Sequence, residues 1–428
     1  MRILLAANAS YVPPRGGATR SNLVWLEKLA EAGHECRIVA AALARDAAGR
    51  RDQMRGEELD SIAAIVRVAG SVEEIRRGPI QVYASADPGR RGQLLREQIR
   101  YFQPDWVLIS SEDLGQVLLA EAHQETPGRV VYLAHTPQLF PFGPASWNRD
   151  EHGTELVRRS AGVVAIGNHT AHYILAHSGR AAEVIHPPIY GTGPFRDCAS
   201  PDNEFVTLIN PCAVKGISIF LALAGRMPDV RFAALPGWGT TAEDRAALER
   251  LPNVTLLPSV RDIEQVLERT RVLLMPSLWY EGFGLSVMEA MLRGIPVLAS
   301  DSGGVLEAKM GTRFVIPVRP IEKYDAVFDD HGLPKAVTPE QDVGPWIEAL
   351  RAILYDRKLY AEESAVSRKR AIEFVRSIRP GRLGEYLQSL EPKPAAAPAA
   401  GRDSLHEALE KLSPEKRALL LKRLRAKA

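Results

Sequence analysis

The sequence alternates short apolar runs with helical stretches, and this alternation limits the possible folds more than any other feature. Residues 3–7 form the first apolar run, and in the stretch that follows Leu23, Leu26, Leu29 and Ala30 share one helical face. Further strands are expected at 37–41, 106–110, 130–134, 162–166, 205–210, 231–235, 271–275 and 295–299. Strands separated by helices are typical of parallel α/β sheets with helices on both faces.

The length of 428 residues and the spacing of these runs predict two doubly wound domains. We expect the first at residues 1–190 and the second at 191–390. A charged helical segment, 361–390, should close the second domain and bend at Pro380-Gly381. Residues 391–402 (EPKPAAAPAAGR) have the composition of a semi-rigid linker, and a helical tail at 403–428 follows.

Composition excludes several classes of function. Fifty-four Lys and Arg balance 52 Asp and Glu to a net charge of +2 without a long basic block, so nucleic acid is not an expected partner. Cys36, Cys198 and Cys212 have neither metal-ligand nor disulfide spacing. The N-terminal apolar run is shorter than a signal-peptide core, and no run reaches a membrane span of about 18 to 20 residues. We expect a cytoplasmic protein without membrane contact.

The segment SLWYEGFGLSVMEAMLRGIPVLAS, residues 277–300, follows the expected strand 271–275 and contains the next helix, 285–293. Ligands of parallel α/β sheets bind where strands end and helices begin, since the first helical turn offers free N–H groups. Gly282 and Gly284 would let backbone amides approach a diphosphate, and Glu281 and Glu289 would bracket it. The alternative is that Glu281 only caps a turn and Glu289 is a solvated helix residue.

EGFGLSVMEAMLRGIPVLASDSGG resembles the signature of the retaining glycosyltransferases of family 4. The similarity extends over about residues 1–390, with Gly16-Gly17, His135, Lys215-Gly216 and Gly237-Trp238-Gly239 in the expected order. The resemblance implies the GT-B fold, in which two Rossmann-like domains face a cleft. The N-terminal domain would then lie on the acceptor side, and the C-terminal domain would bind a nucleotide sugar.

The resemblance also implies roles for individual residues. The expected catalytic residues are Glu281, His135 and Lys215. By the resemblance, Glu281 contacts the sugar hydroxyls, and His135 lies on a loop facing the cleft and hydrogen-bonds the transferring sugar. The Lys215 ammonium would neutralise a phosphate. Glu289 would hold the ribose, and the amides of Gly284, Leu285 and Ser286 the diphosphate. The full donor-binding set is Gly16, Gly17, Gly216, Gly237, Val260, Arg261, Phe283, Gly284, Leu285, Ser286 and Glu289. A structural histidine and a surface lysine are the alternatives for His135 and Lys215.

Two departures concern the charge at the diphosphate. Family members commonly carry an arginine at the position of Ile209, and Arg15, Arg20 and Arg261 are unranked candidates for its replacement. No Asp-x-Asp triplet occurs, and Asp329-Asp330 does not follow an expected strand. We therefore expect neither a metal nor a cofactor, with the nucleoside-diphosphate sugar as co-substrate.

The predicted reaction is transfer of a hexose-type sugar, with retention at the anomeric carbon, to a hydroxyl of a small or carrier-bound acceptor. Two alternatives remain open. A nucleotide-sugar 2-epimerase would bind the same donor without an acceptor, and a catalytically silent relative would act as a scaffold.

The tail, DSLHEALEKLSPEKRALLLKRLRAKA, predicts two short amphipathic helices that cannot bury their leucines alone. LSPEKRALLLKRLR resembles the segments that dock subunits of nonribosomal peptide and polyketide assembly lines. This resemblance implies an assembly-line partner and a peptide or polyketide natural product as acceptor. The alternatives are that the tail packs on the catalytic body or contacts a membrane surface through its Lys and Arg residues.

Overall fold

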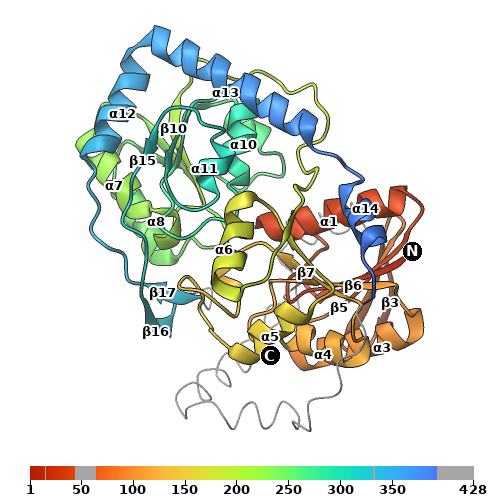
Figure 1. The fold of residues 1–428 in the computed structure, drawn as a ribbon. Helices are drawn as coiled ribbons and strands as arrows, with labels where there is room; N and C mark the ends of the chain where they lie inside the picture. Colours follow the sequence, from red (N-terminus) through yellow and green to blue (C-terminus); the bar gives the residue numbers. More distant parts are fainter. Residues whose placement is uncertain (15, 44–63, 331–332, 393–428) are drawn as a thin grey trace.

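The computed structural model describes residues 1–14, 16–43, 64–330 and 333–392, which form two α/β domains (Figure 1). All of the strands expected from the apolar runs are present, and their ends differ from the predicted ones by at most two residues. The predicted tail and almost all of the predicted linker lie outside the described residues.

The N-terminal domain is built on a nine-stranded sheet in the order β3-β4-β5-β2-β1-β6-β7-β8-β9. Its parallel strands are β1 (Arg2–Ala6), β2 (Glu35–Ala41), β5 (Ile80–Ser85), β6 (Trp106–Ser110), β7 (Val130–Ala134), β8 (Gly162–Ala165) and β9 (Glu183–Val184). The helices are α1 (Gly16–Glu31), α3 (Pro88–Phe102), α4 (Val117–Glu125), α5 (Glu151–Arg159) and α6 (Asn168–Ser178), with η1 at Pro137–Leu139. Strands β6 and β7 are buried along their whole length because helices cover both faces.

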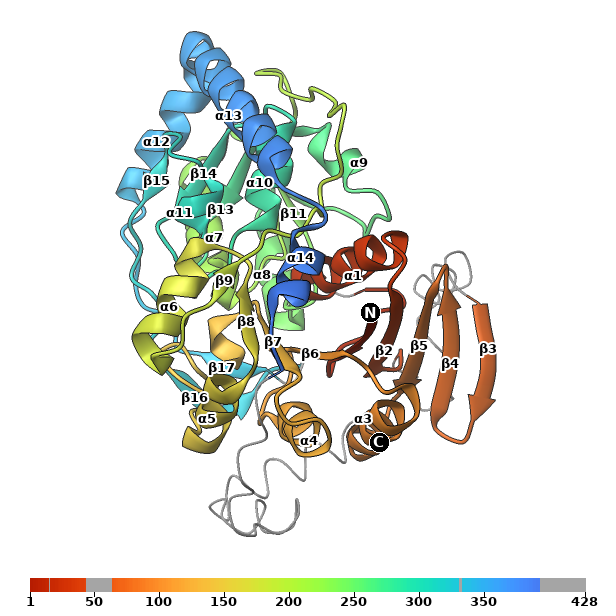
Figure 2. The ribbon, with the colours of Figure 1, turned by 45° about the vertical axis from the view of Figure 1, so that its right-hand side comes forward.

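One edge of this sheet was not predicted. Strands β3 (Ala64–Ala69) and β4 (Val72–Arg77) pair antiparallel with each other, and β4 pairs antiparallel with β5. Figure 2 shows this meander extending the sheet beyond α3. Tight turns containing Gly70 and Gly78, both with positive φ, join the three strands.

The C-terminal domain has a six-stranded parallel sheet in the order β12-β11-β10-β13-β14-β15. The strands are β10 (Phe205–Ile209), β11 (Phe232–Leu235), β12 (Val254–Leu256), β13 (Thr270–Met275), β14 (Val297–Ser300) and β15 (Val315–Ile316). The helices are α7 (Ile217–Arg226), α8 (Ala242–Glu249), α9 (Glu264–Leu267), α10 (Leu285–Leu292), α11 (Val305–Ala308) and α12 (Gly344–Tyr355), with η2 at Ala213–Lys215. A separate hairpin, β16 (Tyr324–Phe328) with β17 (Pro334–Ala336), extends from this domain.

The C-terminal helical segment divides between the two domains. Helix α13 (Arg357–Ser377) packs on α10, and the helix ends before Pro380-Gly381, where the sequence predicts a break. Helix α14 (Arg382–Ser389) then contacts α1 of the N-terminal domain, with Arg382 paired to Glu183 (Figures 1 and 2). The expectation that the whole segment 361–390 closes the second domain was therefore wrong for its last helix.

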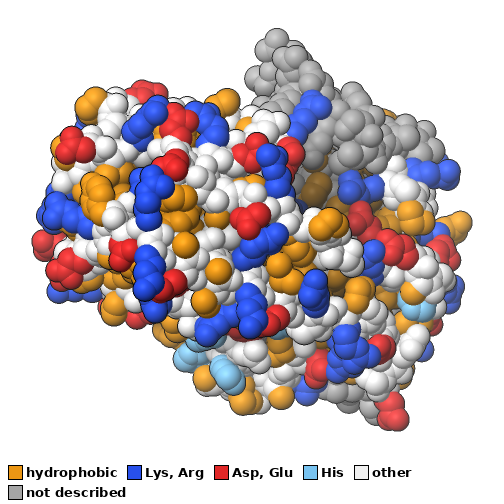
Figure 3. Space-filling model, turned by 90° about the horizontal axis from the view of Figure 1, so that it is seen from above, with side chains coloured by type: hydrophobic (Ala, Val, Ile, Leu, Met, Phe, Trp, Pro, Cys, Tyr) orange, Lys and Arg blue, Asp and Glu red, His pale blue; other side chains and the backbone are white. Residues whose placement is uncertain are grey.

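Among the described helices, none combines the length and the apolar character that crossing a bilayer requires. Figure 3 shows one face on which Lys and Arg side chains are interspersed with Asp and Glu. All three cysteines lie within the described residues and are free thiols.

We expect Gly216→Ala to destabilise the protein strongly. Gly216 has a φ of +76°, and an added Cβ would lie 1.9 Å from the carbonyl oxygen of Pro276. Backbone strain and this clash should lower the free energy of unfolding by at least about 2 kcal/mol, measured by urea unfolding. Gly225→Ala is the matched control, because Gly225 is helical with no atom within 4 Å of its Cβ position. The control should be neutral or about 0.5–1 kcal/mol more stable. Equal stability of both variants would contradict the close approach of the two loops.

Candidate functional site

The candidate site lies where the carboxyl ends of the parallel strands of the two sheets meet. Loops that follow β7, β10 and β13 reach this region, together with the N-termini of α1 and α10. The helices approach closely across the domain interface, because a Cβ added to Gly17 would lie 2.8 Å from Leu285 Cδ1. Gly16, at the start of α1, has a φ of +84° and open space at its Cβ position. Two helix N-termini therefore face one region, where their dipoles favour an anion.

Glu281 is the charged centre of this region and is 7% exposed. Its Oε1 accepts hydrogen bonds from Lys215 Nζ at 2.5 Å, Ser277 Oγ at 2.5 Å and Trp279 Nε1 at 2.7 Å. The Lys215 ammonium also lies 4.7 Å from the centre of the Trp279 ring, a cation–π distance. The structure thus joins Glu281 and Lys215, which the sequence places 66 positions apart, in one ion pair.

The loop that carries Glu281 packs tightly against the N-terminal domain. Gly282 leaves no room for a side chain, since an added Cβ would lie 2.1 Å from the carbonyl oxygen of His135. Thr170 Oγ1 donates to the carbonyl oxygen of Gly282 at 3.0 Å, and Gly304 N donates to that of Glu281 at 2.8 Å. These contacts fix the backbone at Glu281 relative to both domains.

His135 follows β7 as predicted, but its side chain is buried, with 2% exposure, rather than facing an open cleft. Its Nε2 lies 2.7 Å from Asn22 Oδ1, and its backbone N donates to Ser111 Oγ at 3.1 Å. The other ring nitrogen, Nδ1, has no hydrogen-bond partner among the described residues. Burial lowers the pKa of His135 to about 3, so the ring is neutral at physiological pH.

Glu289, on α10, pairs with Arg20 of α1 across the domain interface at 3.1 Å. Its side chain is only 13% exposed, so it is not the solvated helix residue of the alternative interpretation. Arg20 is one of the three candidates to replace the family arginine at position 209, and this ion pair places it at the domain interface. Arg261 is exposed, and Arg15 lies outside the described residues. Ile209 is half-buried and packs against the apolar core.

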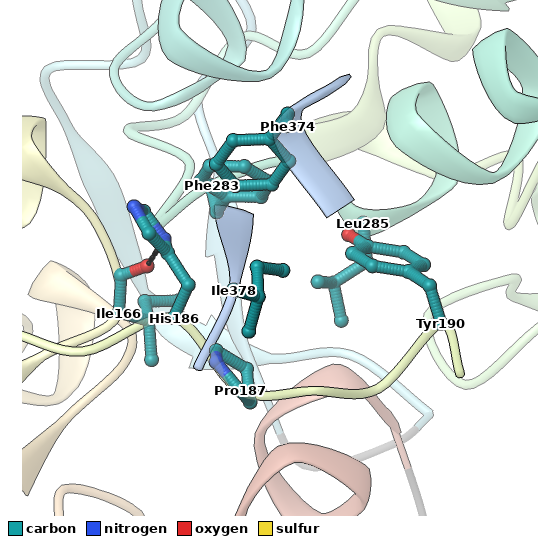
Figure 4. Close-up of a pocket in the computed structure, with 8 residues that line it drawn as sticks. All are labelled: Ile166, His186, Pro187, Tyr190, Phe283, Leu285, Phe374 and Ile378. Carbon is teal, nitrogen blue, oxygen red and sulfur yellow. Dashed lines mark hydrogen bonds between the residues drawn. The ribbon is translucent and has the colours of Figure 1, made fainter. Parts of the chain in front are cut away.

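Helix α10 starts directly after Gly284, whose φ is +104°. No side chain of the described residues caps this helix, which leaves the amides of Leu285 and Ser286 as candidate anion ligands. The ring of Phe283 points the other way and stacks on Phe374, with centroids 5.5 Å apart. Figure 4 shows Phe283 with Phe374, His186 and Ile378 around a small apolar pocket between the domains. Phe283 was expected to bind the donor, and in the structure its ring packs in the interface between the domains.

Two of the remaining predicted donor residues, Gly237 and Val260, lie near the carboxyl end of β11. Asn210 Oδ1 accepts a hydrogen bond from Gly239 N at 2.9 Å and would lie 2.6 Å from a Cβ on Gly237. Val260 packs on the apolar cluster beneath this edge. Asn210, Ser277, Trp279 and Asn22 are site residues that the sequence reasoning did not identify. Ser277 and Trp279 lie inside the quoted segment 277–300, whereas Asn22 and Asn210 carry no local signal.

Metal ligation has no obvious candidate in the parts of the chain that the structure describes. Within those ranges, no group of three or more His, Cys, Asp or Glu side chains is arranged to hold a metal ion. The site offers an anionic ligand the Lys215 ammonium, the Arg20 guanidinium and the N-termini of α1 and α10.

Two family models match the chain, one in each domain. Residues 15–190 match Glycosyltransferase Family 4, and residues 206–328 match Glycosyl transferases group 1. The chain belongs to the glycosyltransferases. None of the curated proteins is significantly similar to this glycosyltransferase in sequence.

Solved structures confirm the expected GT-B fold class of this glycosyltransferase. HepE from Anabaena, solved with UDP and glucose, is 18% identical over 91% of this chain and 100% of HepE, with a TM-score of 0.58. A glycosyltransferase from Rickettsia africae is 14% identical over 90% of this chain and 97% of its own, also with a TM-score of 0.58. WaaG, a glycosyltransferase involved in lipopolysaccharide biosynthesis, is 14% identical over 91% and 100%, with a TM-score of 0.58.

We expect His135→Gln to make the glycosyltransferase less sensitive to acid. The pKa of His135 is lowered to about 3 in the folded protein and is about 6.5 in an unfolded chain. Below pH 6.5 the unfolded chain therefore binds a proton that the folded protein does not, and His135 lowers stability as the pH falls towards 3. The loss of unfolding free energy between pH 7.5 and 4.5 should be smaller in the variant by roughly 2 to 3 kcal/mol, measured by urea unfolding. His152→Gln, at an exposed position on α5, is the control. The same pH dependence in wild type and His135→Gln would contradict the burial of a neutral ring.

Proposed function

We propose that this glycosyltransferase moves a hexose-type sugar from a nucleoside diphosphate to an acceptor hydroxyl with retention at the anomeric carbon. The observation that carries the proposal is the Lys215–Glu281 pair, 2.5 Å apart, beside the N-termini of α1 and α10. This arrangement puts a cation and helix dipoles next to a carboxylate, which matches a donor that joins a diphosphate to a polyhydroxyl sugar. Structural neighbours were solved with UDP and glucose and with UDP-glucose, so we propose a uridine diphosphate sugar as the donor.

Donor binding would rearrange the ion pair. The diphosphate is the stronger anion, and Lys215 together with the amides of Leu285 and Ser286 would neutralise it. Ser277 and Trp279 would still donate to Glu281 Oε1, which they reach at 2.5 and 2.7 Å. Glu281 would then be held in place while its free lone pairs accept hydrogen bonds from the sugar hydroxyls. Glu289 would accept from the ribose hydroxyls in place of Arg20, which leaves Arg20 free to face the diphosphate.

The transfer step follows from this placement. The bond between the anomeric carbon and the phosphate oxygen breaks, and its electron pair remains on the phosphate. The acceptor oxygen forms the new bond on the same face of the sugar, and its proton passes to the departing phosphate oxygen. Lys215 and the α10 N-terminus stabilise the charge that grows on that phosphate in the transition state. Glu281 orients the sugar and need not form a covalent bond.

Glu281→Gln and Glu289→Gln should each leave a folded protein that has lost transfer activity. Each substitution removes a preorganised charged contact, so we expect a loss of roughly 2 to 4 kcal/mol in transition-state stabilisation, read from kcat/KM. Glu289→Gln should mainly raise the Kd of the donor. Glu348→Gln, at an exposed position on α12, is the control. Near-normal turnover of both site variants would reject the proposal.

Turnover should persist in excess EDTA, because Lys215 and the α10 N-terminus supply the positive charge. Lys215→Ala should then reduce kcat/KM severely, whereas Lys323→Ala, at an exposed position outside the site, should not. Activity that disappears on chelation and returns with magnesium would show that the charge assignment is wrong.

Labelled donor distinguishes the proposed transfer from the two alternative functions. A transferase moves label to the acceptor, and a 2-epimerase converts the sugar while it stays on the nucleotide. A silent scaffold binds no nucleoside diphosphate, which a thermal-shift panel of UDP, GDP, ADP and TDP would reveal.

We propose further that the tail at 403–428 docks the enzyme on an assembly-line protein whose peptide or polyketide product is the acceptor. The support is the sequence resemblance of LSPEKRALLLKRLR alone. Deletion of residues 391–428 should leave a folded enzyme that binds nucleotide sugar but no longer retains an assembly-line subunit encoded beside it. Equal retention by both forms would reject docking, and unfolding of the truncated chain would show that the tail packs on the body.

A further inference from the structure

A chain of hydrogen-bonded polar side chains runs beneath the candidate site from the half-buried Glu112 to the buried His135. Asn22, on α1, is fully buried and stands at its centre. Its Nδ2 lies 2.8 Å from Tyr11 Oη and 3.1 Å from Ser110 Oγ, and its Oδ1 lies 2.7 Å from His135 Nε2. The proposed transfer step makes no use of Asn22.

The hydrogen bonds in this chain have one direction. Burial raises the pKa of Glu112 to about 7, so at pH 8, the pH of the tests below, Glu112 is a carboxylate and can only accept. Ser110 Oγ then donates to Glu112 Oε2 at 3.5 Å. The single hydroxyl hydrogen of Ser110 is then committed, so its oxygen accepts from Asn22 Nδ2. This orientation turns Asn22 Oδ1 towards His135, and an oxygen can only accept from Nε2–H. A neutral imidazole carries one N–H, so Nδ1 has a free lone pair.

The lone pair belongs to a residue whose backbone packs against the loop of Glu281. Nδ1 is buried and has no partner among the described residues. The carbonyl oxygen of His135 lies against Gly282, the residue next to Glu281. Trp25, which is 1% exposed, lies beside the ring with centroids 5.9 Å apart. A buried acceptor without a donor is unfavourable, so a sugar hydroxyl that donates a hydrogen bond to Nδ1 would be bound favourably.

We propose that Asn22 is a positioning residue that holds His135 in the tautomer with hydrogen on Nε2, so that Nδ1 accepts a hydrogen bond from a hydroxyl of the transferred sugar. The inference rests on the proposed function, since that function supplies the hydroxyl. In the opposite tautomer Nδ1–H would present a donor and could not accept. The imidazole acts only as an acceptor, and no proton moves through it.

The first test reads the tautomer directly in the full chain without ligand, at pH 8. NMR of protein labelled with ¹⁵N in the histidine rings distinguishes the two tautomers, and His135→Gln assigns the signal. The parent should show one tautomer with hydrogen on Nε2. Asn22→Leu should give a mixture or the opposite tautomer, whereas Asn22→Asp, which keeps an acceptor oxygen, should preserve the parent signal. An unchanged tautomer in Asn22→Leu would overturn the inference.

The second test, also at pH 8, separates the sugar from the nucleotide. Asn22→Leu should bind UDP as the parent does but bind UDP-glucose about tenfold more weakly, and Asn22→Asp should restore most of that loss. Asn253→Leu is the matched control, because Asn253 donates to the carbonyls of Ala224, Met227 and Val230 far from the site. The control should lower the melting temperature without changing the tautomer or the ratio of the two affinities. Equal loss of both ligands in Asn22→Leu would reject the positioning role. If the parent binds neither ligand, the proposed function fails, and the NMR result still decides the tautomer.

Discussion

Glu281 is a nearly buried carboxylate, and a buried charge is stable only when donors surround it. Its partners come from two loops, Lys215 from the one after β10 and Ser277 with Trp279 from the one after β13. The backbone of Glu281 also accepts from Gly304, which follows β14. One residue therefore ties together three neighbouring loops of the second sheet, and the position of α10 depends on it.

The order of elements could be predicted because parallel sheets buried on both faces require apolar strands, and such runs are visible in one sequence. The quoted segment 277–300 likewise predicts its own strand, loop and helix, since Gly284 and Gly294 mark the helix ends. Glu281 and Lys215 were found as separate residues. Their ion pair could not be predicted, because the sequence does not show which strands are neighbours in the sheet and therefore which loops lie side by side.

Other features depended on tertiary contacts that have no local pattern. Strands β3 and β4 alternate weakly in hydrophobicity, although the turns at Gly70 and Gly78 were a signal that could have revealed a meander. Helix α14 has the composition of any amphipathic helix, so its contact with α1 is decided by the length of chain after Pro380. Asn22 lies on a helix with no unusual sequence feature. Its proposed role depends on hydrogen bonds to residues far away in the sequence, so the sequence alone could not reveal it.

The chain passes from one domain to the other at His186–Tyr190 and returns between α13 and α14. The two connections lie side by side. The ring centroids of His186 and Phe374 are 4.9 Å apart, and both residues line the pocket of Figure 4. Two adjacent connections of this kind can form a hinge between domains. Sliding of one domain past the other would separate His186 from Phe374. A movement of one domain against the other that keeps this aromatic contact would therefore be a rotation about it.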